Sequence, residues 1–222
     1  MRFRKRKDGT VYPISGSPGK KKAGAVVAGA AVAGAALFGI EGGAVGGSVA
    51  SDGLSAAAQV RVANAQKAAS RGQRGQAWKR VRAKEKPRKY RPQRHLDCVR
   101  NSHGQVRVFF AATPCRSLDR ALTLLADPAG NTFVLSVYWV RMRNAAAARE
   151  LKELDDTYGT GNVNPVACRL LGLAGVTFSG KYYDSRRSGS LVVIAEAEPV
   201  AGTPEPETLE SVVQVATYLP PP

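Results

Sequence analysis

The sequence predicts an α+β protein in which residues 97–222 form a two-layer sandwich with a four-stranded mixed sheet. This stretch alternates between apolar runs of strand length and stretches with helical periodicity, in the order β-α-β-α-β-β-α. It is also nearly neutral, with 12 Lys and Arg against 13 Asp and Glu, although the whole chain of 222 residues has a net charge of +16. The globular domain is therefore expected over 97–222, with the excess basic charge placed before it.

The first predicted elements of this domain are a strand over 105–111 and a helix after Thr113-Pro114. Apolar residues alternate along the strand, which is typical of one buried face. They are Val106, Val108 and Phe110. In the helix, apolar residues recur at i, i+3, i+4 and i+7, namely Leu118, Ala121, Leu122 and Leu125. Together with the next strand, these elements would form a right-handed parallel crossover.

The remaining elements of the domain follow from longer patterns. Residues 132–140 are apolar on both faces, which predicts a central strand. An apolar stripe opposite charged residues predicts a helix over 145–158. Two strands, 176–183 and 191–197, are predicted to pair as an antiparallel hairpin, and a last helix is predicted over 209–216.

The N-terminal part of the chain contains a basic tail and an apolar segment. Residues 1–22 are predicted to be a disordered basic tail with one small hairpin turn at Asp8-Gly9. The Ala/Gly-rich segment 23–50 begins with eighteen uncharged positions, 23–40, that would rise about 27 Å as a helix and nearly span a membrane. Because lysines precede this candidate transmembrane helix, the N-terminus is expected in the cytoplasm and the domain outside it. A signal-type segment and a flexible segment of a soluble, cytoplasmic protein are the alternatives.

Residues 51–96 are predicted to form a basic helical stalk and a Pro-containing hinge. Within 61–96 there are thirteen Lys and Arg but a single acid, Glu85. Helical character is expected over 54–86, interrupted near Gly72 and Gly75. A short amphipathic helix with one indole would suit an anionic membrane surface or another polyanion such as nucleic acid. The candidate contacts are Trp78, Lys79, Arg80, Arg82, Lys84, Lys86, Arg88, Lys89 and Arg91.

The cysteines offer three interpretations. Cys98 and Cys115 flank the first predicted element, which favours a disulfide between them in an oxidising compartment. Free thiols are the second interpretation, and a metal site with His95 and His103 is the third, although the spacing matches no usual zinc pattern. Cys168 is expected to be a small core residue.

No residue pattern assigns a catalytic role, a metal or a cofactor. Glu196 and Glu198 share one face of a strand, and paired carboxylates can act in acid–base chemistry. The expected interpretation of this pair is a solvated strand end, and that of Tyr138 and Trp139 is core packing.

The sequence thus favours a membrane-anchored, non-catalytic binding protein that presents a small α+β domain on a basic stalk, with an unknown protein partner. The first alternative is a soluble nucleic-acid-binding protein that uses 1–22 and 61–96 on phosphates. The second is an enzyme of unidentified activity.

Overall fold

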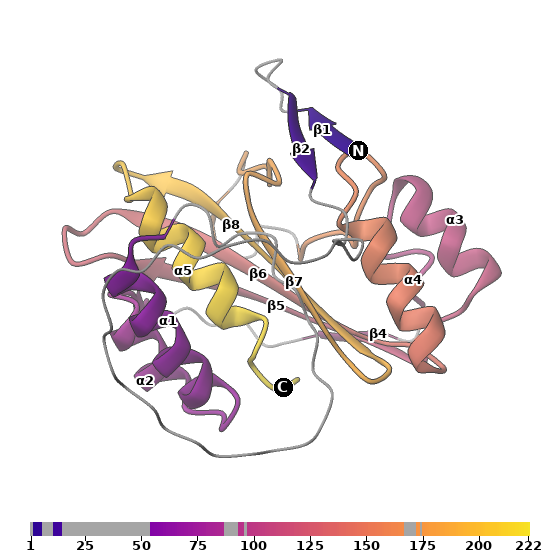
Figure 1. Cartoon of the computed structure of the whole chain (residues 1–222), viewed down its shortest axis with the longest axis horizontal. Helices are drawn as coiled ribbons and strands as arrows, with labels where there is room; N and C mark the ends of the chain where they lie inside the picture. Colours follow the sequence, from indigo (N-terminus) through magenta and orange to yellow (C-terminus); the bar gives the residue numbers. More distant parts are fainter. Residues whose placement is uncertain are drawn as a thin grey trace, which may run out of the picture. The chain divides into compact units, whose positions relative to one another are not determined.

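The computed structural model describes residues 2–5, 11–14, 54–86, 93–95, 97–166, 172–173 and 175–222 (Figure 1). The chain divides into two compact units, Met1–Val45 and Gly46–Pro222. In the first unit, β1 (Arg2–Lys5) and β2 (Val11–Ile14) pair antiparallel, and the predicted turn at Asp8-Gly9 lies outside the described residues. The second unit is α+β, as the sequence predicts.

The sheet of the second unit has six described strands, and all neighbouring strands are antiparallel. Five strands follow the order β3-β5-β6-β8-β7, and β4 pairs with the other end of β5. The strands are β3 (Lys84–Glu85), β4 (Gln93–His95), β5 (Ser117–Ala126), β6 (Thr132–Arg141), β7 (Tyr182–Ser188) and β8 (Leu191–Ala201). The predicted mixed sheet of four strands is therefore wrong.

Five helices cover the sheet and lie in two groups over its opposite ends (Figure 1). One group comprises α1 (Ala56–Ala69), α2 (Arg74–Arg80) and α5 (Pro206–Ala216), and the other comprises α3 (Gly104–Ala112) and α4 (Ala145–Asp155). Successive strand residues point to opposite faces, and the two helix groups pack on alternate residues of the same strands. We call these faces the α5 face and the α4 face.

Each face has its own apolar core. On the α5 face, Leu135 and Trp139 of β6 pack with Leu209 of α5 and with Trp78 of α2. On the α4 face, the intervening strand residues, such as Tyr138, pack with helix residues that include Phe110 of α3 and Leu151 of α4. The sheet is thus buried on both sides, which explains why β5 and β6 are apolar in both residue registers.

Residues 105–111 form most of helix α3, where the sequence predicts a strand. Val106 and Phe110 are fully buried, but Val108 between them is 70% exposed. A spacing of four residues places Val106 and Phe110 on one face of a helix, whereas a strand would have buried all three residues. The alternation was misleading because the pair Val106 and Phe110, four residues apart, fits one face of a helix as well as one face of a strand.

Residues 117–126 form strand β5, where the sequence predicts a helix. Leu118 and Leu122 face the α4 side and Ala121 and Leu125 face the α5 side. A strand buried on both faces can place apolar residues at any spacing, including i, i+3, i+4 and i+7, and so imitates a helical stripe. With these two elements exchanged, β5 and β6 form an antiparallel hairpin and the predicted parallel crossover is absent from the described sheet.

The other predicted elements of the domain are confirmed with shifted bounds. Strand β6, helices α4 and α5, and strand β8 lie where they are expected. The hairpin strand β7 begins only at Tyr182 and continues to Ser188, so the turn is a tight one at Gly189, which has φ +57°. Residues 184–188, expected in the turn, belong to the strand.

The predicted single-pass membrane topology is contradicted. Among the helices that the structure describes, none is long and apolar enough to cross a membrane. The longest, α1, has 14 residues and rises about 21 Å, whereas a hydrocarbon core is about 30 Å thick. Residues 23–40, on which that prediction rests, lie outside the described residues.

Candidate functional site

The basic segment 54–86 packs against the globular unit through α1 and α2. Helix α1 places buried alanines and Val62 in the core of the α5 face, and Arg61 of this helix pairs with Glu207 of α5 at 2.7 Å. Helix α2 buries Trp78, which is 1% exposed, beside Ala77 and Val81. These residues, expected to form a separate stalk, are therefore part of the Gly46–Pro222 unit.

The burial of Trp78 changes what α2 presents to solvent. The sequence suggests that this indole anchors the helix to a surface, but it fills the core instead. The outward side of α2 and of the segment after it carries only polar and charged side chains. We call the five exposed cations of α2 and of the segment after it the α2–β3 cluster: Lys79, Arg80, Arg82, Lys84 and Lys86.

Few acids oppose the α2–β3 cluster. The neighbouring acid, Glu85, lies 3.6 Å from Arg74 and not from a cation of the cluster. Arg80 donates a hydrogen bond to the backbone oxygen of Asn64 at 3.4 Å, and none of the ion pairs found within the described part of the chain involves the cluster. The cluster is thus a local concentration of uncompensated positive charge.

Arg82 occupies a backbone conformation that normally favours glycine. Its φ is +57°, and it follows α2 at the position where helices often end in the left-handed region. The amide of Arg82 donates to the oxygen of Lys79 at 3.3 Å, and the amide of Ala83 donates to the oxygen of Trp78 at 2.9 Å, which is the hydrogen-bond pattern of a Schellman motif. This turn directs the chain from α2 into β3 and places Arg82 on the exposed side.

Three predicted contacts, Arg88, Lys89 and Arg91, lie outside the described residues. The chain is described again at β4, where Gln93 pairs with Arg120 and His95 with Leu118. Because β3 pairs with Leu125 and Ala126, β3 and β4 lie on the same edge of β5, near its opposite ends.

The predicted disulfide between Cys98 and Cys115 is present. Their Cα atoms are 6.2 Å apart, and helix α3 lies between them in the sequence. A helix of nine residues rises only about 14 Å, so the chain returns more easily than it would from a strand. Since both sulfurs are bonded to each other, neither can serve in the metal site that the sequence also allows. His103 instead lies with Nδ1 2.9 Å from the side-chain oxygen of Asn164.

A buried group of carboxyls and tyrosines lies on the α4 face. Tyr183 of β7 places its hydroxyl 2.7 Å from Oδ2 of Asp155 and 2.9 Å from Oδ1 of Asp156, at the C-terminal end of α4. Asp156 also accepts hydrogen bonds from Ser185 and, at 2.5 Å, from Lys152. The Tyr183 hydroxyl has one proton and can donate it to only one of the two carboxyls at a time. A protonated Asp155 would donate the second hydrogen bond to the Tyr183 oxygen.

Burial keeps Asp155 in its neutral form near neutral pH. The residue is 5% exposed, and desolvation raises the pKa of its carboxyl from 3.8 to about 8. Within this net shift, desolvation is the largest cause and the charges of Glu196 and Asp156 also raise the pKa, whereas the hydrogen bond from Tyr183 and the charge of Lys152 lower it. The adjacent Asp156 pairs with Lys152.

Glu196 extends this group across the sheet and is not a solvated strand end. It is 7% exposed, and burial raises the pKa of its carboxyl from 4.5 to about 7, against hydrogen bonds from Asn162 at 3.0 Å and Tyr138 at 3.4 Å. Glu198 is half-buried and accepts hydrogen bonds from the amide and hydroxyl of Ser179. The two carboxyls thus have different partners and do not form an acid–base pair.

Sequence reasoning missed Asp155, Asp156 and Tyr183. The adjacent aspartates end a helix on which they would normally be solvated, and only the packing of α4 on β7 encloses Asp155. Because Asp155 and Glu196 are nearly inaccessible to solvent, a substrate could not reach them in this conformation. These carboxyls are thus buried, whereas the α2–β3 cluster is exposed to solvent.

Comparisons with known proteins add no family to this description. The sequence matches no protein-family model, and searches of curated proteins and of solved structures return no significant match.

Proposed function

We propose that this protein is a non-catalytic binding protein whose α2–β3 cluster contacts the phosphate backbone of double-helical nucleic acid. The observation that carries the proposal is the orientation of α2, whose apolar side is buried and whose basic side is exposed. Trp78 is buried, and Lys79, Arg80, Arg82, Lys84 and Lys86 are exposed and form no ion pair with an acid in the part of the chain that the structure describes. Such a surface neutralises phosphates and releases their counterions.

The buried indole favours a nucleic acid over a lipid surface. An amphipathic helix that docks on a membrane inserts apolar side chains into the boundary between headgroups and acyl chains. The one aromatic residue of 54–86 is Trp78, and its side chain is committed to the core. A phosphate backbone requires only positive charge, which the cluster supplies.

The same observation favours a duplex over a single strand. Binding of single strands commonly uses aromatic side chains on which the bases stack. The exposed side of 54–86 offers no aromatic side chain. Contacts to phosphates alone carry little sequence information, so we expect binding with little sequence preference.

The test measures binding of the full-length protein to a labelled 16-base-pair DNA duplex at several salt concentrations between 50 and 200 mM. A triple variant, Lys79→Gln, Lys84→Gln and Lys86→Gln, should bind at least about tenfold more weakly. Its slope of log K against log salt should be smaller by about 2.7, because each phosphate contact contributes about 0.9.

A matched control removes three exposed cations from other parts of the domain. They are Arg100, Arg107 and Lys181, each changed to Gln. This control should keep the affinity and nearly all of the salt slope of the unmodified protein. No binding by the unmodified protein at 50 mM salt, or equal losses in the two triple variants, would overturn the proposal.

A further inference from the structure

A second group of exposed arginines lies at the opposite end of β5 from the α2–β3 cluster. Arg116 directly precedes β5, Arg141 ends β6, and Arg143 lies two residues further along the chain. The amide of Arg116 donates to the backbone oxygen of Arg141 at 2.6 Å, so the three residues occupy neighbouring segments. We call them the sheet-end cluster.

The sheet-end cluster is also positive without local compensation. All three side chains are exposed, and no ion pair found among the described residues includes them. The first acid of the following helix, α4, is Glu150, in its second turn. Arg141 alternates with Trp139 and therefore faces the α5 side, the side on which α2 packs.

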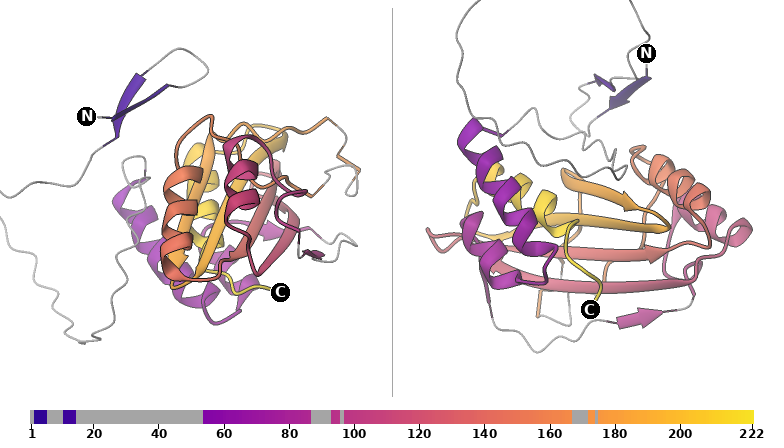
Figure 2. Two further views of the ribbon diagram at one scale, coloured as in Figure 1. Left: turned by 90° about the vertical axis from the view of Figure 1, so that its right-hand side faces the viewer. Right: turned by 60° about the horizontal axis from the view of Figure 1, so that its bottom comes forward.

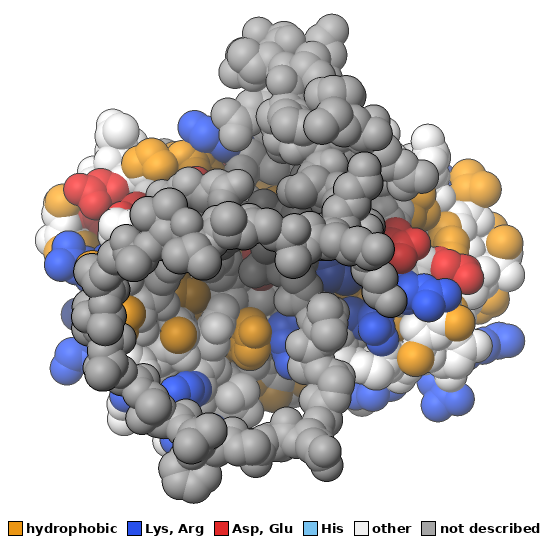
Figure 3. Space-filling view, viewed as in Figure 1, with side chains coloured by type: hydrophobic (Ala, Val, Ile, Leu, Met, Phe, Trp, Pro, Cys, Tyr) orange, Lys and Arg blue, Asp and Glu red, His pale blue; other side chains and the backbone are white. Residues whose placement is uncertain are grey.

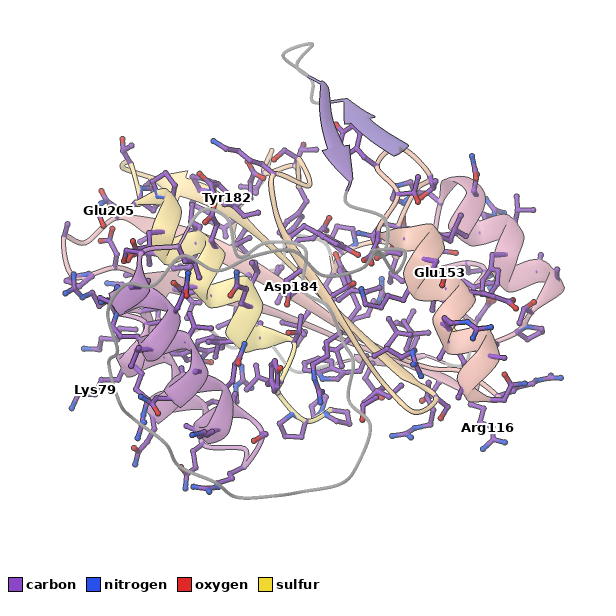
Figure 4. All side chains as sticks on the ribbon, viewed as in Figure 1. Lys79, Arg116, Glu153, Tyr182, Asp184 and Glu205 are labelled. Carbon is purple, nitrogen blue, oxygen red and sulfur yellow. A yellow bond between two sulfur atoms is a disulfide. The ribbon has the colours of Figure 1, made fainter. Side chains whose placement is uncertain are left out.

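The strand register gives the distance between the two clusters. Lys84 pairs with Ala126 at one end of β5, and Arg141 pairs with Ser117 at the other end. The ten residues of β5 span about 30 Å. Lys79 and Arg116 are labelled on opposite sides of Figure 4, and the right-hand view of Figure 2 shows the short magenta strand β4 near one end of β5, with which it pairs.

The distribution of charge on the visible face agrees with this arrangement. In Figure 3, most Lys and Arg side chains lie in the lower half of the view, where Figure 4 labels Lys79 and Arg116, and the acids lie mainly in the upper half. The edge of the sheet at β5 therefore has positive charge at both ends.

A distance of about 30 Å corresponds to about one turn of a nucleic-acid duplex, which is 34–36 Å long. Phosphates of the same strand one turn apart face the same side of the duplex. We infer that the α2–β3 cluster and the sheet-end cluster together bind the backbone of one duplex, about one helical turn apart, along the β5 edge. This inference rests on the proposed function, and it requires that the bound duplex be at least about nine base pairs long.

The test compares DNA duplexes of 6 and 16 base pairs, each closed by the same hairpin loop. A 6-base-pair duplex is about 20 Å long and reaches one cluster at a time. The triple variant Arg116→Gln, Arg141→Gln, Arg143→Gln should bind the 16-base-pair duplex at least about tenfold more weakly. The same variant should lose no more than about twofold on the 6-base-pair duplex, because the α2–β3 cluster remains.

The controls separate this inference from the proposed function. The Arg100, Arg107 and Lys181 triple variant should behave as the unmodified protein on both duplexes, and circular dichroism should show that every variant is folded. Unchanged affinity of the sheet-end variant for the 16-base-pair duplex, or equal losses on both lengths, would overturn the two-cluster inference and leave the proposed function standing. No binding of either duplex by the unmodified protein would overturn both.

Discussion

The two faces of the sheet hold their helices by different means. On the α5 face, α2 and α5 are held mainly by buried apolar side chains such as Trp78 and Leu209. On the α4 face, α3 is tied by the Cys98–Cys115 disulfide, and α4 meets β7 through Asp155 and Tyr183 as well as through Leu151. Attachments on the α4 face therefore respond to pH and to reductants. On the α5 face the apolar packing does not respond to pH, and the pH-sensitive contact there is the hydrogen bond that Thr217, which caps α5, donates to the buried carboxyl of Asp184.

The largest expected effect is a loss of stability as the pH rises. Burial raises the pKa of Asp155 to about 8, of Glu196 to about 7 and of Asp184 to about 6, each above its value in the unfolded chain. An acid with a raised folded-state pKa contributes stability that is complete below the unfolded pKa, near 4. This stability is lost as the pH rises through the folded pKa.

We therefore expect the free energy of unfolding, measured with urea, to fall by several kcal/mol between pH 4 and pH 8. Asp155→Asn should flatten this profile most between pH 6 and pH 8. Glu153→Gln, at an exposed carboxyl of the same helix (Figure 4), should leave its shape unchanged. A profile that is flat or rises over this range would show that these carboxyls are not enclosed as described.

The next effect tests the apolar face. Trp78→Ala should lower the free energy of unfolding by about 3–5 kcal/mol, because it removes a large buried side chain and leaves a cavity. Gln76→Ala, at an exposed position of the same helix, is the control. The pH profile of the Trp78 variant should keep its shape, since the titrating groups lie elsewhere. A loss below about 1 kcal/mol would mean that α2 is not packed on the sheet.

The disulfide gives a somewhat smaller effect on the α4 face. It closes a loop between positions 17 residues apart. A closed loop of this size restricts the unfolded chain and so stabilises the folded state by about 3 kcal/mol. A reductant should therefore lower the melting temperature measured by calorimetry. The double variant Cys98→Ser, Cys115→Ser should melt at the lower temperature with or without reductant. Equal melting temperatures of the unmodified protein in both conditions would contradict the bond.

The smallest effect separates stability from binding. Arg82→Gly should raise the free energy of unfolding by about 0.5–1 kcal/mol, because glycine adopts φ +57° without strain. The same change removes one cation and should weaken duplex binding in the salt titration. Lys79→Ala removes a cation of the cluster without relieving strain, so it should weaken binding with little change in stability. Stabilisation of both variants, or of neither, would argue against strain at Arg82.

The candidate sites, buried and exposed, could be predicted from the sequence only in part. The disulfide could be inferred because two cysteines flank one short element, and the basic cluster because thirteen cations fall within 61–96. Burial of Asp155 could not be inferred, since a carboxyl at the end of an amphipathic helix is usually solvated. It depends on β7, which begins 27 residues later and supplies Tyr183.

The sequence by itself determined the distribution of charge, the central strand β6 and the helices α4 and α5, and it favoured the pairing of Cys98 with Cys115 over the alternatives. These features follow from local composition, or from periodicity in segments with one clearly polar side. Only the tertiary structure decided that 105–111 is helical and that 117–126 is a strand. It also decided that Trp78 faces inward. The physical reason is that in short segments the same spacing of apolar residues can fit a helix or a strand, so the choice depends on which neighbours cover each face.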